Sequence, residues 1–317
     1  MKEAMKKYLG VDLSKERLDC AALESNKEWS LPNAAQGWAR LIKELRAWQE
    51  KEGAEVLVVC EASGGYERGL IGALQQAGLA VALVNPRQVR DYARASGLLA
   101  KTDRLDARVL ARYGAHFAPA PLALRTAGQS RLRELVERHR QLSEARVSES
   151  NQLQHLQCAD LRRLGRAHLR LLEGQLEKID ALIAKHLETE HQAAAAALRA
   201  VPGIGLQSAA LLLAELPELG QASKGQIAAL AGVAPFNHDS GPWRGSRHIR
   251  GGRGQVRRGL WMATLVAVRH HPRLREFYQR LRNNGKPVKV ALIAAMRKLL
   301  LILNAILRPL CQTPAHP

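Results

Sequence analysis

The sequence predicts an α/β domain followed by a mostly helical remainder, and three observations carry that prediction. Short apolar runs alternate with helical patterns within residues 1–122. Residues 126–192 are nearly free of glycine and proline, and the last third is rich in glycine and arginine. At 317 residues and 46% hydrophobic, the chain is long enough to bury the cores of two or three domains. We therefore predict domains at 1–122, 123–195 and 196–317.

The first domain opens with strands and continues with alternating helices and strands. The stretch KYLGVDLSKERLDCAALES predicts two strands joined by a polar turn, and EWSL predicts a third. NAAQGWARLIKELRAWQEKEG predicts a helix that Asn33 caps and Gly53 ends. EVLVVCEAS is a continuous apolar run, typical of a strand covered on both faces, and YERGLIGALQQAG and LAVALVNP predict one more helix and strand. These units together indicate a mixed sheet.

Four carboxylates stand at positions that this sheet would bring to one end. Asp12 ends the first strand and Glu61 ends the apolar run, while Asp103 and Asp106 lie three apart in the helical stretch AKTDRLDARVLARY. Residues three apart share one face of a helix, where like charges repel. A carboxylate that ends an apolar strand is also costly unless a cation compensates it. Each acid alone is more often explained by exposure to solvent, so the hypothesis depends on all four meeting.

Carboxylate oxygens without histidine or cysteine select Mg²⁺ or Mn²⁺ over zinc. Two such ions can activate a nucleophile and stabilise a leaving oxygen in phosphodiester chemistry. The interpretation is therefore a metal site formed by Asp12, Glu61, Asp103 and Asp106. The basic residues interleaved with the aspartates, among them Arg104 and Arg108, would contact phosphates.

Apolar residues recur every three or four positions through the middle of the chain, and they predict a long amphipathic helical pair. This pair is either a coiled coil or an antiparallel hairpin that turns near Gly165. Ordinary core packing and a dimerisation arm both explain the pattern, and the narrow apolar face favours dimerisation. The positions are Leu172, Leu176, Ile179, Ile183 and Leu187.

The net charge of +19 is concentrated in the last third of the chain. Residues 1–120 carry a net charge of +3 and residues 121–218 of +1, whereas residues 219–317 hold 17 Lys and Arg against 2 acids. So one-sided a charge creates a strong positive field, and the abundant polyanion in a cell is nucleic acid. A ribosome-like partner or an anionic membrane surface is the competing explanation.

Composition indicates a cytoplasmic protein. No run of about 18 uninterrupted apolar residues predicts a membrane span, and the basic start lacks the pattern of a secretion signal. Cys20, Cys60, Cys158 and Cys311 are scattered without a Cys-x-x-Cys pair, which fits reduced thiols and argues against a disulfide framework or a zinc knuckle.

Two glycine-containing stretches in the last third are candidate contacts with nucleic acid. Gly203 and Gly205 follow Pro202 and lead into an apolar helix, so the backbone resembles a helix-hairpin-helix turn that could hold a phosphate. A simple tight turn explains this pattern equally well. Further on, a glycine-rich stretch free of acids from Ser240 onward brings six candidate phosphate contacts, namely Arg244, Arg247, Arg250, Arg253, Arg257 and Arg258.

Ser240 lies in HDSG, just ahead of these arginines. A serine in a turn is usually structural. As a nucleophile it would need a base, or a field that stabilises the alkoxide and the pentavalent phosphorus. The arginines supply such a field, and His238, Asp239 and His248 are weak candidates for the base.

Taken together, several separated motifs resemble the insertion-sequence one-ten family of transposases. They are YLGVDLSKERLDC, CEASGGYERGL, NPRQVRDYARASGLLAKTDRLDARVLARY, VPGIGLQSAALLLAEL and LAGVAPFNHDSGPWRGSRHIRGGRGQVRRGLWMATL. The resemblance covers nearly the whole chain and implies a ribonuclease H-like domain of the Holliday-junction-resolvase kind, a coiled coil and a C-terminal transposase domain. It places the four acids of the family on Asp12, Glu61, Asp103 and Asp106, and the family's serine on Ser240.

The resemblance further implies strand exchange between a circular element and a target DNA. It implies guidance by a structured, element-encoded bridge RNA and assembly as homodimers and tetramers, with Ser240 as nucleophile beside the metal site. Two alternatives stay open: a non-catalytic nucleic-acid-binding protein whose acids hold structural ions, and a junction nuclease that uses metal alone without a covalent serine step.

Overall fold

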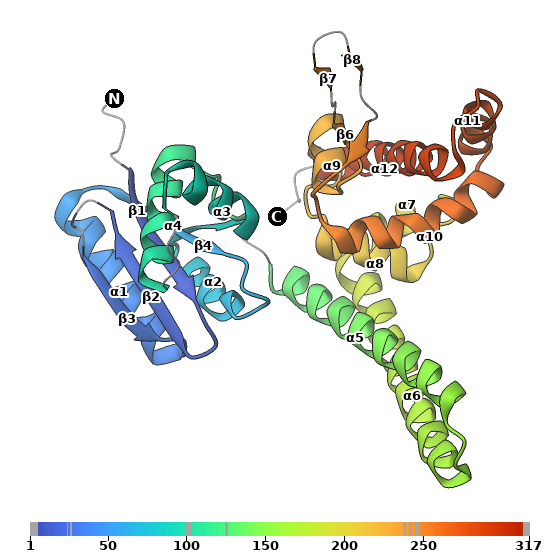
Figure 1. The fold of residues 1–317 in the computed structure, drawn as a ribbon, viewed down its shortest axis with the longest axis horizontal. Helices are drawn as coiled ribbons and strands as arrows, with labels where there is room; N and C mark the ends of the chain where they lie inside the picture. The colour runs from blue at the N-terminus through green and yellow to red at the C-terminus, as the bar shows by residue number, and fades with distance from the viewer. Residues whose placement is uncertain are drawn as a thin grey trace. The chain divides into compact units, whose positions relative to one another are not determined.

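A computed structural model describes residues 6–23, 25, 27–98, 103–123, 126–236, 239–240, 243–244 and 247–312. For some of these only the backbone is described, including Asp103, Arg104, Ser240 and Arg244. The chain divides into two compact units, Met1–Leu124 and Arg125–Pro317 (Figure 1). The first is a mixed α/β unit, as the sequence predicts, and the second is mostly helical.

The first unit is built on a five-stranded sheet in the order β3-β2-β1-β4-β5. Strands β1 (Lys6–Leu13), β2 (Arg17–Ala22) and β3 (Glu28–Pro32) form an antiparallel meander. Strands β4 (Glu55–Glu61) and β5 (Ala80–Val84) run parallel to β1. The central strand β1 is therefore the place where antiparallel pairing changes to parallel pairing.

Helices cover both faces of the sheet (Figure 1). Helices α1 (Ala35–Glu52) and α2 (Glu67–Gln76) bury Leu41, Leu45 and Leu70 against one face. Helices α3 (Pro86–Ala95) and α4 (Asp103–Phe117) cover the other face, where Leu110 packs with Val59 of β4. Burial on both sides explains why the β4 sequence is continuously apolar.

The ends of α1 agree only in part with the sequence prediction. Gly53 ends the helix in the left-handed conformation, with φ of 59°, as predicted. The predicted cap by Asn33 is wrong, because the N-cap is Ala34 and it makes no side-chain cap. The Asn33 side chain instead donates to the carbonyl oxygen of Ser14 and accepts from the Trp38 indole nitrogen. The Asn33 side chain therefore joins the β1–β2 turn to the helix. The local sequence does not predict this contact.

The middle of the chain forms an antiparallel hairpin of α5 (Ala127–His155) and α6 (Ala159–Glu190) (Figure 1). The predicted turn near Gly165 is wrong, because the chain reverses at residues 156–158. Gly165 lies inside α6 and is buried, and a Cβ there would lie 2.5 Å from the Leu153 side chain. This glycine serves close packing of the two helices rather than a turn.

The apolar positions of the hairpin divide into two groups. Near its base, Ile183 and Leu187 are buried with Leu132 of α5 and with Ala210 of α8 (Leu206–Glu215). Toward the turn several large apolar side chains are exposed, namely Val147, Leu161, Leu164 and Leu171. Core packing thus explains the base of the pattern and leaves the outer end unexplained.

The remaining helices of the second unit surround one apolar core. They are α7 (Gln192–Arg199), α8, α9 (Lys224–Leu230), α10 (Gly254–His270), α11 (Pro272–Asn283) and α12 (Val288–Gln312). Within the described residues, only α12 has a segment long and apolar enough to cross a membrane, over Val288–Cys311, and half of it is buried. Its Leu299, Leu300 and Leu303 lie at the centre of the core, which accounts for the apolar composition. Asn304, also buried, accepts from the amide of Gly220 and donates to the carbonyl oxygen of Ala222.

Candidate active site

Two of the four predicted acids lie near the ends of adjacent parallel strands, with Asp12 one residue before the end of β1 and Glu61 at the end of β4. In the β1–β4 ladder the last paired residues are Val11 and Cys60, so Asp12 and Glu61 are the next residues along the two strands. Neighbouring strands lie about 4.8 Å apart. Both acids are half-buried. The strand register therefore brings Asp12 and Glu61 together at one end of the sheet.

Helix α4 lies directly against this part of β1. A Cβ on Gly10 would overlap the carbonyl oxygen of Ala107 and lie 2.5 Å from the amide nitrogen of Ala111. A Cβ on Gly114 would lie 2.9 Å from the ring of Tyr8. Because Tyr8 meets the later part of α4 and Gly10 the earlier part, the helix runs antiparallel to the strand.

That alignment carries β1 toward the first turn of α4. Alternate residues of a strand face the same side, so Asp12 faces α4 as Gly10 does. Two strand residues span about 6.6 Å, which corresponds to four or five residues of helix. Counting back from Ala107 reaches the turn that begins at Asp103 and includes Asp106. The backbone thus brings the first turn of α4 to the end of the sheet where Asp12 and Glu61 lie.

The side chains complete this arrangement only in part. Asp106 is half-buried, whereas the side chain of Asp103 lies outside the described residues. Among the side chains that are described, no three from His, Cys, Asp and Glu lie close enough together to hold a metal ion. Any metal centre here would therefore depend on Asp103.

Glu67 organises the loop that follows Glu61. It is buried at the first turn of α2, and one carboxylate oxygen accepts from the Ser63 amide at 3.1 Å, the Ser63 hydroxyl at 2.9 Å and the Gly65 amide at 2.9 Å. Burial raises the pKa of Glu67, but these hydrogen bonds outweigh it and the pKa lies below its ordinary value. The ionised side chain thus fixes the chain immediately after a predicted site residue.

Two further polar contacts lie on the face of the sheet that α4 covers. Asp19 stands opposite Asp12 in the β1–β2 ladder, and its oxygens accept from Arg17 Nε at 2.9 Å and from the Ser30 hydroxyl at 2.5 Å. Arg108 of α4 donates through Nε to Glu28 at 2.7 Å. The guanidinium of Arg108, predicted to contact phosphate, therefore already ties α4 to the edge strand.

The backbone of Ser240 belongs to a small hairpin. Strand β7 (Asp239–Ser240) pairs with β8 (Trp243–Arg244), and Ser240 stands opposite Trp243. The side chains of Ser240 and Arg244 and the candidate base His238 lie outside the described residues. Strands β6 (Pro235–Phe236) and β9 (His248–Ile249) pair where the segment leaves and rejoins the helical core.

Two family models match the chain on either side of the hairpin turn. A DEDD transposase-domain model, described as "Transposase", matches residues 9–158, and "Transposase IS116/IS110/IS902 family" matches residues 195–279. The chain belongs to the IS110 family of transposases. It is therefore an enzyme that recombines DNA, the function that the sequence favoured over a non-catalytic nucleic-acid-binding protein.

Two relatives of this transposase match 96% of its length, and a third matches part of it. The chain is 28% identical over 314 residues to the "Pilin gene-inverting protein" of Moraxella bovis, covering 96% of each chain. The same figures of 28% and 96% hold for the protein of that name from Moraxella lacunata. The "Insertion element IS900 uncharacterized 42 kDa protein" of Mycobacterium paratuberculosis is 30% identical over 59% of this chain and 50% of its own.

In the arginine-rich segment of the transposase, some arginine side chains form hydrogen bonds within the protein. Arg253 donates to both carboxylate oxygens of Glu218 at 2.6 Å and to the carbonyl oxygen of Glu215 at 2.9 Å. Arg257 donates to the carbonyl oxygens of Gly232 and Gly251. Both residues hold the start of α10 to the loops around α9, so charge alone does not reveal their role.

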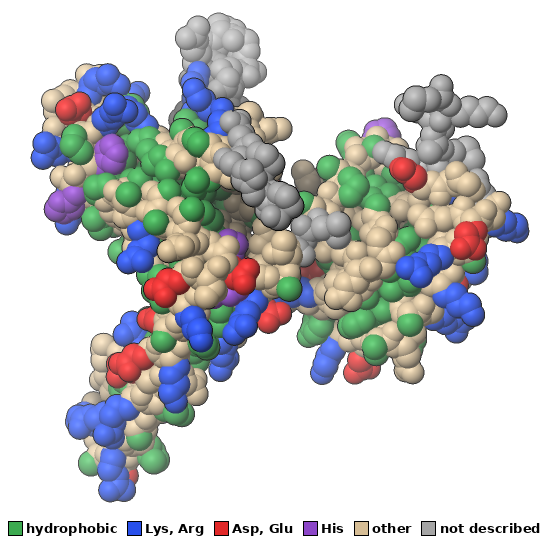
Figure 2. All heavy atoms as spheres, turned by 180° about the vertical axis from the view of Figure 1, so that it is seen from behind, with side chains coloured by type: hydrophobic (Ala, Val, Ile, Leu, Met, Phe, Trp, Pro, Cys, Tyr) green, Lys and Arg blue, Asp and Glu red, His purple; other side chains and the backbone are tan. Residues whose placement is uncertain are grey.

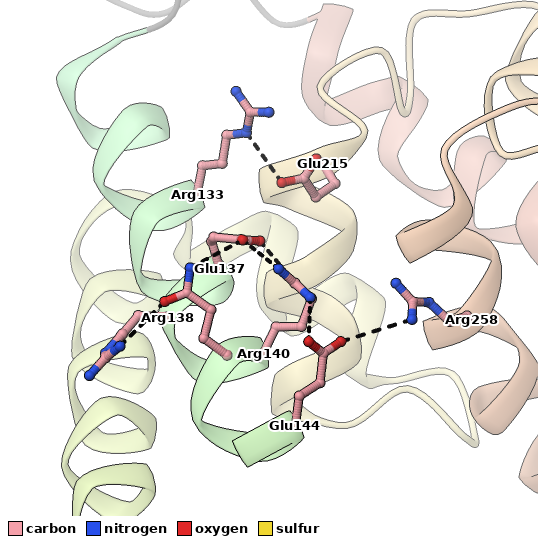
Figure 3. Close-up of polar contacts among 8 residues, drawn as sticks. Arg133, Glu137, Arg138, Arg140, Glu144, Glu215 and Arg258 are labelled. Carbon is pink, nitrogen blue, oxygen red and sulfur yellow. Dashed lines mark hydrogen bonds and ion pairs between the residues drawn. The ribbon is translucent and has the colours of Figure 1, made fainter. Parts of the chain in front are cut away.

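Arg258 approaches an ion-pair network at the junction of the hairpin and the helical core (Figure 3). Arg140 of α5 donates to Glu137 at 2.6 Å and to Glu144 at 2.7 Å, and Arg258 lies 3.9 Å from Glu144. The hydrogen bond from Arg140 is the main reason that the pKa of Glu137 lies below its ordinary value, while burial opposes it. Arg247, Arg250 and Arg258 are all exposed, and of the three only Arg258 lies beside this network.

Gly203 has two structural reasons to be glycine. Its φ is +97°, and a Cβ would overlap the carbonyl oxygen of Ala263 in α10. Gly205 is the N-cap of α8, with open space around its α-carbon. These features explain Gly203 without a ligand, and a contact of this turn with nucleic acid stays a prediction.

Sequence reasoning overlooked Glu67 and Asp19. The sequence around Glu67 held a pattern that could have identified it, namely an acid that follows Gly64 and Gly65 at the start of a predicted helix. In the structure Glu67 lies in the first turn of α2, and both glycines have positive φ. For Asp19 the only local pattern was Arg17, two residues away on the same strand, because its other partner Ser30 becomes a neighbour only through the sheet.

Proposed function

We propose that this transposase cuts and rejoins DNA strands with Asp12, Glu61, Asp103 and Asp106 as ligands of Mg²⁺ or Mn²⁺, and with Ser240 as the nucleophile. The observation that carries the proposal is the alignment of β1 with β4 and α4. The strand order, with β2 antiparallel and β4 and β5 parallel to β1, supports a ribonuclease H-like domain.

The donor set fits a hard divalent cation. All four proposed ligands are carboxylates, and oxygen ligands favour Mg²⁺ and Mn²⁺. When bound, the metal would supply charge that stabilises the oxygens around the reacting phosphorus. Glu67 would keep Glu61 in place through its bonds to Ser63 and Gly65.

Ser240 would exchange one phosphodiester bond for another. A bond forms between its oxygen and phosphorus while the bond from phosphorus to the leaving sugar oxygen breaks, and the serine proton passes to a base. A sugar hydroxyl of another strand reverses the step, so the bond energy is conserved. Two relatives carry a name that denotes gene inversion. An inversion must rejoin every strand that it cuts, which fits this chemistry.

The remaining parts of the proposal concern partners. The strongly basic last third supports binding of two polyanions, the DNA and a structured bridge RNA. The exposed Val147, Leu161 and Leu164 at the outer end of the hairpin support a homodimer joined through these helices, from which a tetramer would assemble.

The test of the serine is denaturing electrophoresis of labelled DNA after reaction with wild-type protein, Ser240→Ala and Ser240→Cys. We expect a covalent protein–DNA adduct with wild type, and neither adduct nor recombinant with Ser240→Ala. Strand exchange by Ser240→Ala would instead favour the alternative of a metal-dependent nuclease without a serine step. A chelator should abolish the activity of the wild-type protein.

A further inference from the structure

Helix α11 carries a polar face that the acid site and the arginine-rich segment do not involve. Its apolar stripe faces inward, because Leu274 is buried in the main core and Phe277 and Tyr278 pack beside α10 and α12. The polar residues of its sequence PRLREFYQRLRN are exposed. Figure 2 shows Lys and Arg side chains gathered around this end of the second unit.

The polar face has a definite pattern when residues are placed at 100° intervals. Arg275 and Arg282, seven apart, line one flank of the apolar stripe, and Arg273 and Arg280, also seven apart, line the other. The centre of the outward face lies between these flanks. It carries three side chains that can hydrogen-bond in a fixed direction, namely Glu276, Gln279 and Asn283.

The flanking arginines differ from those in the arginine-rich segment. Arg253 is bound by two oxygens of Glu218, whereas among the residues that the structure describes none of the four arginines of α11 is paired with a carboxylate. Arg280 lies over the Phe277 ring at 5.5 Å and Arg282 donates to the carbonyl oxygen of Lys286, contacts that orient the side chains and leave their charge uncompensated.

We propose that α11 enters the major groove of double-stranded DNA. A helix is about 10–12 Å across with its side chains, and the major groove of B-form DNA is about 12 Å wide. Cations on both flanks would meet the phosphates on the two walls of the groove. Gln279 and Asn283 would contact adenine edges and Glu276 the amino group of cytosine.

The same pattern does not fit an RNA duplex, whose major groove is too deep and narrow for a helix. Single-stranded nucleic acid can bind to a cationic surface without any particular pattern. Its binding would not need a row of amide and carboxylate groups between two cationic flanks. The inference rests on the action of this transposase on DNA and adds a direct contact with DNA base pairs beyond the acid site.

The test measures binding to duplex DNA by electrophoretic mobility shift at several salt concentrations, without divalent metal. We expect the paired change Arg275→Ala and Arg282→Ala to lower the slope of log affinity against log salt by about two. Gln279→Ala with Asn283→Ala should leave the slope unchanged. It should also reduce the preference for the best sequence, selected from a random duplex pool, by about tenfold.

A matched control removes two exposed cations elsewhere, with Arg40→Ala and Lys43→Ala on α1, and should leave the duplex slope unchanged. An unchanged slope in the Arg275 and Arg282 variant overturns the proposal, as does an effect confined to single strands or to RNA. An unaltered base preference in the Gln279 and Asn283 variant overturns the groove assignment. Because no metal is present, failure of the acid-site proposal would show as recombination by Asp106→Asn and would leave this result untouched.

Discussion

The end of the sheet that holds Asp12 and Glu61 is acidic, and the segment from Arg244 to Arg258 is basic. Different features of the fold position the residues of these two regions. Asp12 and Glu61 lie where they do because two parallel strands keep them in register, and α4 reaches them because Gly10 has no side chain. In the arginine-rich segment neighbours along the chain have unrelated roles. Arg253 grips Glu218 while Arg250 is exposed. Backbone geometry thus determines the first region, and individual side-chain partners determine the second.

The largest expected effect is on activity at the acid end. Asp106→Asn keeps the shape of the side chain but removes a negative charge from the proposed metal site. We expect recombination to fall at least about a hundredfold, beyond the typical loss for a residue that only supports a ligand. The assay is conversion of a labelled donor and target pair in Mg²⁺. Asp91→Asn, which alters an exposed carboxylate on α3, should retain wild-type activity. Full activity of Asp106→Asn would remove the acid site from the mechanism.

The next effect tests whether close packing of α4 creates the acid end. In Gly10→Ala the added methyl group would overlap the backbone of α4, so the helix must move away from β1. We expect a loss of about 3 kcal/mol in the free energy of unfolding, and reduced activity even where the protein is folded. Urea unfolding at 25 °C measures the free energy of unfolding, and the recombination assay measures the activity.

Gly72→Ala is the matched control for that substitution. Gly72 lies inside α2 with open space around its α-carbon, so the same methyl group should stabilise the protein by about 0.5–1 kcal/mol. If Gly10→Ala were as well tolerated as Gly72→Ala, the contact between β1 and α4 would not control the site.

Arginine substitutions should separate the two roles in the arginine-rich segment. Arg253→Ala removes a paired bridge to Glu218 and a bond to the carbonyl oxygen of Glu215, so we expect a loss of about 2 kcal/mol in stability. Arg250→Ala changes an exposed side chain, and stability should change by less than about 0.5 kcal/mol. Its effect should be on DNA binding, where the salt slope falls by about one. If Arg253→Ala and Arg250→Ala were equally stable, the two arginines would not have the different roles inferred from their contacts.

The sequence predicted the sheet well because its evidence is local. Continuous apolar runs identified β4 and β5, and strand ends identified Asp12 and Glu61. The turn near Gly165 was wrong because glycine serves close helix packing as well as turns, and only the neighbouring Leu153 distinguishes the two. Asn33 was misread for a similar reason, since its partners Ser14 and Trp38 become neighbours only in the folded unit.

The partners of the arginines could not be predicted in the same way. Arg253 meets Glu218 across 35 positions of sequence, and Arg108 meets Glu28 across 80. A count of charges measures the field around the last third of the chain, but it cannot say which guanidinium groups are already bound. Only the tertiary contacts separate Arg253 from Arg250.

The smallest expected effect tests Glu67, a charged side chain whose hydrogen bonds hold the backbone in place. It is a charged side chain, yet it acts on the backbone by holding Ser63 and Gly65 behind Glu61. Because its pKa is lowered by folding, its contribution to stability is present above the ordinary value of 4.5 and is lost as the pH falls below that value. Glu67→Gln should cost about 1 kcal/mol at pH 7, and the difference from wild type should shrink between pH 5 and pH 3.5. Urea unfolding across this range measures it, with Glu50→Gln, an exposed change on α1, as a control that shows no such convergence. A difference that stayed constant with pH would mean that Glu67 holds the loop by shape rather than by charge.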